Sequence, residues 1–140
     1  MEIKASDVMK LRQMTQAGMM DCKKALIEAE GDFDKAKEIL REKGKVIAAK
    51  RSDRETTEGA VLARANADKT VATLTCLGCE TDFVAKNETS QSYVEAVAKQ
   101  ALASSAADVE AMMDEKWIED SSKTVKEVLV EKTATIGEQL

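Results

Sequence analysis

The sequence predicts an α+β protein, with a three-helix bundle first and a β-hairpin packed with helices behind it. Apolar residues recur at helical spacing in residues 1–44 and again after Tyr93. Between these stretches, residues 70–77 alternate between two faces, which is typical of a strand. The 140 residues contain no proline, which favours long helices. We expect two small units, a helical one with a basic connector at 1–54 and a mixed one at 55–140.

The first helix is expected to begin at Ser6, a favourable N-cap residue. Val8, Leu11 and Thr15 then fall on one face. Gly18 is expected to end this helix, because glycine adopts the left-handed conformation at little cost. A helix this short is marginal by itself, so its apolar face must pack against neighbours.

Two further helices are predicted by the same spacing. One begins near Met19 and ends at Gly31, and the other follows its N-cap Asp32 and closes at Gly44. Their apolar faces consist of Cys22, Ala25, Leu26 and Ala29 in the first, and Phe33, Ala36, Ile39 and Leu40 in the second. Three helices of about three turns bury such faces only as a compact bundle.

Residues 41–54 are interpreted as a solvated, charged connector, with six Lys or Arg against two Asp or Glu. Residues 46–49 could instead extend the third helix. Contact with nucleic acid is less favoured, because the chain carries a net charge of −5. The acidic excess lies in residues 58–140, which have 15 Asp or Glu against 8 Lys or Arg. Neutralising phosphates requires a basic face, so we expect no direct nucleic-acid partner.

A hairpin is expected next, with a weaker strand at 60–65 joined through 66–69 to the strand at 70–77. In the second strand Ala72, Leu74 and Cys76 share one face, which we expect to point inward. A two-stranded hairpin is marginal alone, so the later helices must cover it.

Helical spacing returns three times in the second half of the chain. A long helix is followed by a short one from Asp108 and by a last one after residues 121–122. Their apolar residues are Tyr93, Val94, Val97, Ala98, Ala101 and Leu102, then Met112 and Met113, and finally Val125, Val128, Leu129 and Ile136.

The composition excludes several classes of function. Without histidine there can be no Ser-His or Cys-His nucleophile and no imidazole ligand for a metal. The six glycines form no phosphate-binding loop, and four aromatics are too few for a sugar-binding cleft. We therefore expect no enzyme active site, metal or cofactor. No apolar run approaches a membrane span and the N-terminus lacks a signal peptide, so we expect a cytoplasmic protein with no membrane partner.

Cys76 and Cys79 have the Cys-x-x-Cys spacing of a redox pair or half a zinc site. Zinc would need two more ligands, and Cys22 is expected in a helix core. A redox pair normally opens a helix, whereas this one ends a strand. Two reduced thiols are therefore the favoured interpretation, with a thiol oxidoreductase as an alternative.

The segment from Thr81 to Asn87 directly follows the stronger strand and contains Phe83 beside Asp82. A phenylalanine on an acidic turn is either tucked under the next helix or presented to a partner. From the residues alone we favour the tucked position, because isolated apolar residues near strand ends usually pack.

Met19 and Met20 raise the same question at the start of the second helix. Met20 lies off the apolar face and is expected to be exposed, whereas Met19 fits either position equally well. Flexible methionines suit a protein-binding surface, and Arg12 and Lys23 would flank them.

Two segments carry a resemblance to a known family. Residues 11–26, LRQMTQAGMMDCKKAL, resemble the N-terminal signature of bacterial translation elongation factor Ts, and residues 81–87, TDFVAKN, resemble its second signature. Both occur in the family's order and spacing. The resemblance covers essentially the whole chain, as the N-terminal domain plus the first half of the family's core.

This resemblance implies a bundle like that of ubiquitin-associated domains and a guanine nucleotide exchange factor for elongation factor Tu in translation elongation. The factor would bind its partner in GDP-bound and nucleotide-free states. In this family a wedge residue, matched by Phe83, disturbs magnesium and phosphate binding until GDP leaves. The matching contact residues are Arg12, Met19, Met20 and Lys23 on the bundle, and Thr81, Asp82, Phe83 and Val84 on the tip.

The chain departs from the family in two respects. Gln16 stands where the family has a glycine, which is tolerable only if the backbone needs no positive φ there. Family members also continue beyond the position of Glu138 into a second half of the core that contacts the partner, so we expect a piece of a longer protein. A ubiquitin-associated-like adaptor without exchange activity is the alternative, although an adaptor has no use for an acidic-aromatic tip.

Overall fold

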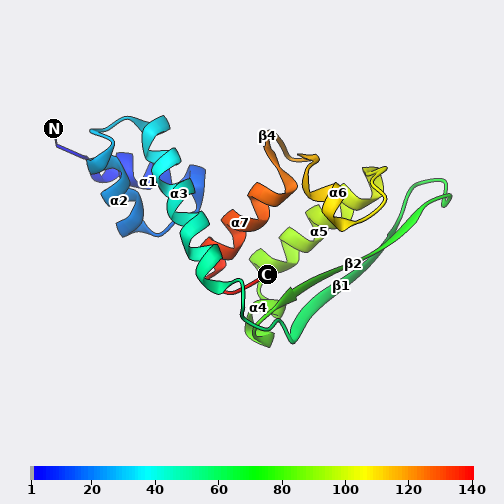
Figure 1. Ribbon diagram of the computed structural model, residues 1–140. Coiled ribbons are helices and arrows are strands. Elements are labelled where there is room, and N and C mark those ends of the chain that lie inside the picture. The colour runs from blue at the N-terminus through cyan, green and yellow to red at the C-terminus, as the bar shows by residue number, and fades with distance from the viewer. Residues whose placement is uncertain (1) are drawn as a thin grey trace.

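The computed structural model describes residues 2–140 and has an α+β fold. Three helices form a bundle at one end, and the long α3 leads from it to a hairpin and the remaining helices (Figure 1). The first half contains α1 (Ala5–Thr15), α2 (Met19–Glu28), α3 (Phe33–Arg51), β1 (Glu58–Ala65) and β2 (Ala72–Cys79). The second half contains α4 (Asp82–Lys86), α5 (Glu88–Ala103), α6 (Val109–Met113), β3 (Lys116–Trp117), β4 (Asp120–Thr124) and α7 (Val125–Ile136).

The bundle has its own core, built from small and aliphatic side chains. Leu11 and Leu26 are fully buried at its centre, and each aliphatic side chain of this size stabilises the fold by about 1.5–3 kcal/mol. The remaining buried members are Val8, Cys22, Ala25, Ala29 and Ala36. These are the residues that the helical spacing placed inward, so the predicted faces of the first three helices are confirmed.

The turn between α1 and α2 differs from the prediction. Ser6 is not the N-cap, because α1 begins at Ala5 after Lys4. Gln16, and not Gly18, ends the helix in the left-handed conformation, with a φ of 57°. Gly18 instead has extended backbone and caps α2. The family glycine that Gln16 replaces would suit this position, since a side chain in the left-handed region costs about 1–2 kcal/mol.

The third helix does not end at Gly44, and the prediction of a solvated connector after it is wrong. α3 continues to Arg51, as the alternative of a helical extension proposed. Gly44 is buried against α7, where a Cβ atom would lie 3.5 Å from the Cβ of Ala134. Arg41 forms an ion pair with Glu127, the capping-box residue of α7. The division into domains at residue 54 stays a prediction.

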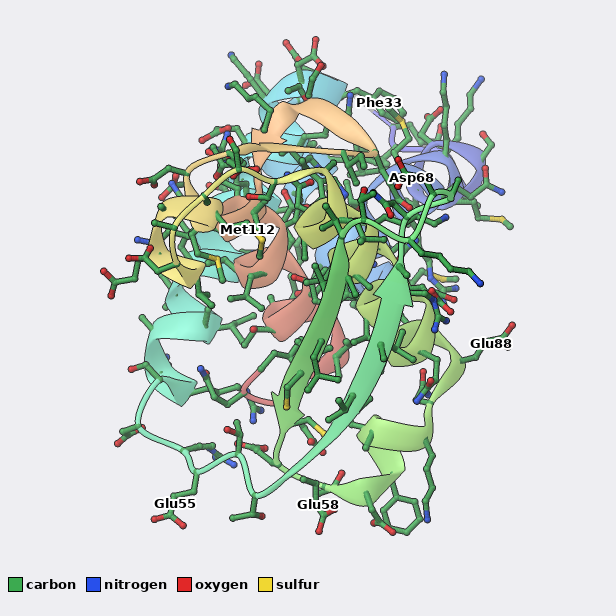
Figure 2. All side chains as sticks on the ribbon, turned by 90° about the vertical axis from the view of Figure 1, so that its right-hand side faces the viewer. Phe33, Glu55, Glu58, Asp68, Glu88 and Met112 are labelled. Atoms are coloured by element: carbon green, nitrogen blue, oxygen red, sulfur yellow. The ribbon has the colours of Figure 1, made fainter. Side chains whose placement is uncertain are left out.

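The hairpin forms as predicted, but with its other face inward. β1 and β2 pair antiparallel from Glu58 opposite Cys79 to Ala65 opposite Ala72. Leu74 is 76% exposed, whereas Thr75 and Cys79 are buried. Figure 2 shows the hairpin in front of the helices that cover only its far side. The expected inward face was wrong because the apolar residues of the buried face are Leu77, at the end of the alternating stretch, and Cys79, just beyond it.

A second core lies between the helices of the rear unit. Tyr93 of α5 and Trp117 of β3 meet with ring centroids 5.9 Å apart, and Val125 and Val128 of α7 close the cluster. The three predicted helices are confirmed as α5, α6 and α7. The small hairpin β3–β4 was not predicted, because its short strands are mostly polar.

Replacing Gln16 by glycine is predicted to raise the free energy of unfolding by about 0.5–1 kcal/mol, because it removes the left-handed strain at some cost in chain entropy. Urea denaturation of the chain measures the change. The control is Gln13→Gly, an exposed position inside α1, which should lower stability by roughly 0.5 kcal/mol. Equal losses for both variants would contradict the strained turn.

Gly44→Ala is predicted to be neutral or stabilising by up to about 1 kcal/mol, because alanine favours the helix and its Cβ has ordinary contact distance to Ala134. Gly44→Leu should lower the thermal midpoint sharply, because the longer side chain must push α7 away. Lys45→Leu, at an exposed position one residue on, is the matched control. If Gly44→Leu behaves like this control, the α3–α7 contact does not exist in solution.

Candidate partner-binding surfaces

The segment that carries Phe83 is a short helix and not a simple turn. α4 begins after the N-cap Thr81, whose hydroxyl accepts a hydrogen bond from the Val84 amide at 3.4 Å. Ala85 is buried on the inner side of the helix, whereas the side chain of Phe83 is 84% exposed. The tucked position that we favoured for Phe83 is therefore wrong. The alternative, a ring presented on the surface, describes the structure.

Charged residues share the short helix with this exposed ring. Asp82 lies next to Lys86 at 3.5 Å, and both side chains are largely in solvent. A surface pair of this kind adds little stability, so Asp82 remains accessible. Val84, the residue after Phe83, is half-buried. The tip, which we define as residues 81–84, thus presents an aromatic side chain beside a carboxylate.

The tip is attached to the end of α3 by ion pairs. Glu80, which precedes it, lies 3.7 Å from Arg51 and 3.5 Å from Arg54. The buried thiol of Cys79 donates a hydrogen bond to the carbonyl oxygen of Thr81 at 3.2 Å. The sequence analysis missed Arg51, Arg54 and Glu80, because it placed the two arginines in solvent. No local pattern indicates that they pair with a glutamate on the other side of the hairpin.

The bundle surface, defined as Arg12, Met19, Met20 and Lys23, lies on α1 and the start of α2. The predicted exposure of Met20 is confirmed at 63%, and Met19 is also exposed, at 48%. Arg12 and Lys23 are exposed, and neither forms a salt bridge within residues 2–140. Two flexible apolar side chains and two unpaired cations are therefore available to an acidic, apolar partner surface.

The structure does not bring the bundle surface and the tip together. α1 and α2 lie at one end of α3, and α4 lies near the other end (Figure 1). α3 has 19 residues, which corresponds to a length of about 28 Å. The two surfaces therefore lie far apart on the molecule.

The cysteine pair is not arranged for redox chemistry. Cys76 is exposed on one face of β2, and Cys79 is buried on the other. Residues three apart in a strand point to opposite faces, so their sulfur atoms cannot bridge while the strand is intact. Burial, together with the Glu138 and Glu58 carboxylates, raises the pKa of the Cys79 thiol, which opposes formation of a reactive thiolate. The structure thus argues against the thiol oxidoreductase.

Within residues 2–140, no group of three or more Cys, Asp or Glu side chains is placed to hold a metal ion. None of the helices in this range is long and apolar enough to cross a membrane.

Comparison with known proteins supports the family resemblance from which the residues of the two surfaces were assigned. The family model described as Elongation factor TS matches residues 80–140, a range that includes the tip. Elongation factor Ts of Flavobacterium johnsoniae is 51% identical over 138 residues, and that of Amoebophilus asiaticus is 50% identical over all 140. The protein of the same name from Clostridium kluyveri is 49% identical over 138 residues.

The chain belongs to the elongation factor Ts family. The matches cover 99–100% of this chain but 42% of the Flavobacterium protein, 50% of the Amoebophilus protein and 45% of the Clostridium protein. The chain therefore spans about half the length of the curated relatives it matches. The matched residues include both the bundle surface and the tip, while the contacts assigned to these residues remain proposals.

Met20→Ala is predicted to leave the thermal midpoint of the chain within about 2 °C of the unaltered protein, because the side chain is mostly in solvent. Leu26→Ala on the same helix should cost about 2–5 kcal/mol, because it opens a cavity in the bundle core. Calorimetry of the two variants checks the contrast. A comparable loss for Met20→Ala would mean that Met20 is part of the core.

Proposed function

We propose that this chain is a guanine nucleotide exchange factor that promotes release of GDP from elongation factor Tu during translation elongation. The bundle surface docks on the partner, and the tip enters beside the nucleotide site. Phe83 acts as the wedge and Asp82 contacts the same region, with Thr81 and Val84 at its base. The role needs no covalent step, no cofactor and no direct contact with nucleic acid or membrane, and it places the chain in the cytoplasm.

The observation that carries the proposal is the exposure of Phe83 on a short, anchored helix. An aromatic side chain in water is unfavourable, and burying one is worth about 1.5–3 kcal/mol. Such a ring on an acidic tip suits insertion into an apolar pocket of a partner. A simple adaptor that docks through the bundle would have no use for it, because the tip lies near the other end of α3 (Figure 1).

The physical mechanism is a competition between two ligands of one partner. Phosphate-loop amides and magnesium hold GDP on a GTPase of this kind. A factor that binds the nucleotide-free form more tightly than the GDP-bound form weakens GDP binding by the same ratio. Insertion of the Phe83 ring supplies part of this difference, because the pocket opens only when the phosphate and magnesium contacts are disturbed.

Docking and displacement are assigned to different side chains. The bundle surface offers Met19 and Met20 as apolar contacts and Arg12 and Lys23 as cations. Contacts that are equally strong in the GDP-bound and nucleotide-free states of the partner increase the affinity for the factor but leave the affinity for GDP unchanged. Uniform binding of substrate and transition state fails to accelerate a reaction for the same reason. The effect on GDP must then come from the tip.

Phe83→Ala is predicted to lower the maximum rate of GDP release about tenfold or more, since about 1.4 kcal/mol corresponds to a factor of ten. Release of fluorescent GDP from elongation factor Tu, measured over a range of chain concentrations, provides the rate. Asp82→Ala should act in the same direction. The folded stability of both variants should be unchanged, because the tip is exposed.

The matched control is Val109→Ala, which truncates another exposed apolar side chain outside both surfaces and should leave release unchanged. If the unaltered chain binds elongation factor Tu without accelerating release, the chain is an adaptor and the proposal fails. If Phe83→Ala leaves release unchanged, Phe83 is not the wedge.

A further inference from the structure

The chain turns back after α7 and brings a carboxylate to the base of the tip. Gly137 follows the helix in the left-handed conformation, with a φ of 83°, which glycine adopts without strain. One Glu138 oxygen, Oε1, accepts hydrogen bonds from the backbone amides of Glu80 at 3.0 Å and Thr81 at 2.9 Å. The other, Oε2, accepts one from the Thr81 hydroxyl at 2.6 Å.

These contacts join segments that are 57 and 58 residues apart in the sequence. The end of the chain lies close to α4 in space (Figure 1). Leu140, two residues beyond Glu138, packs against the second core. The Gly137 turn on one side and Leu140 on the other therefore hold Glu138 in place, and the carboxylate is not at the end of a loose tail.

The contacts also continue into the helix that carries the ring. Thr81 donates its hydroxyl proton to Glu138 and accepts a hydrogen bond from the Val84 amide with the same oxygen. When a hydroxyl donates its proton to a carboxylate, the hydroxyl oxygen becomes a better acceptor. The two hydrogen bonds of Thr81 therefore strengthen one another. A helix of five residues is not stable by itself. Its orientation must come from contacts at its ends and from the burial of Ala85.

We propose that Glu138 is a positioning residue for the tip. Its carboxylate fixes the backbone of Glu80 and Thr81, and thereby the direction in which the Phe83 side chain points from the surface. This inference rests on the proposed function, because a fixed direction matters only if the ring must enter a partner. A ring that is already oriented loses less conformational freedom on insertion, so more of its burial is available to displace GDP.

The first arm of the test measures the tip without any partner. Glu138→Ala should accelerate amide hydrogen exchange in residues 80–86 about tenfold, while the bundle and α5 keep their protection. Glu138→Gln retains a carbonyl oxygen that can face the same two amides and should restore most of the protection. The control is Glu131→Ala, which removes a carboxylate within α7 that pairs with Lys123 and not with the tip.

The second arm measures GDP release from elongation factor Tu over a range of chain concentrations. Glu138→Ala should lower the maximum rate about fivefold while the concentration for half-maximal release stays the same, because docking depends on the bundle surface. Glu138→Gln should recover most of the rate. A general loss of folding would not produce this split or this rescue. Thr81→Val is a further variant that removes both hydroxyl hydrogen bonds, the one to Glu138 and the one from the Val84 amide, and leaves the two backbone amides bound to Glu138.

Unchanged protection of residues 80–86 in Glu138→Ala would overturn the proposal. So would a higher half-maximal concentration with an unchanged maximum rate, which would make Glu138 a docking contact. If the unaltered chain fails to release GDP, the proposed function is wrong, and the hydrogen-exchange arm still decides whether Glu138 orients the tip.

Discussion

The packing of α3 against α7 is the contact on which the arrangement of this protein depends. The two helices approach closely because position 44 carries no bulky side chain: even a Cβ atom there would be in van der Waals contact with the Cβ of Ala134, at 3.5 Å. The ion pair between Arg41 and Glu127 joins the same helices one turn earlier. With this contact, α3 is both the last helix of the bundle and part of the rear unit. The bundle is thereby held at a defined place relative to the hairpin and the tip.

Under the proposed function, a packed connection of this kind would hold the two distant surfaces at a fixed spacing. The bundle surface offers methionines and free cations, while the tip offers an aromatic ring beside a carboxylate. A partner that binds both must adapt to their fixed spacing, and a conformational change is driven by the difference in affinity between its two states. Flexible joining of the same surfaces would increase affinity through effective concentration but would impose no particular geometry.

The tip shows where prediction from the residues reaches its limit. The segment after the stronger strand stands out by its composition, and it carries the second signature of the family. The residues alone nevertheless favoured a buried Phe83, because the hydropathy of a side chain does not show whether the fold has room to bury it. The exposed position follows from α4, which buries Ala85 and so turns Phe83 outward. The contacts of Glu80 and Thr81 were also out of reach, since their partners lie far away in the sequence: Arg51 and Arg54 at and after the end of α3, and Glu138 after α7.

The sequence by itself determined the fold class, most helices, the hairpin and its loop, because these depend on spacing and capping among residues close together in the chain. It also determined which residues form the bundle core, because helical spacing places them on the apolar faces of three neighbouring helices. Only the tertiary structure decided which face of β2 is buried, because alternation separates two faces without saying which one a helix will cover. It likewise decided that α3 continues through Gly44, since packing of this position against α7 offsets the low helix propensity of glycine.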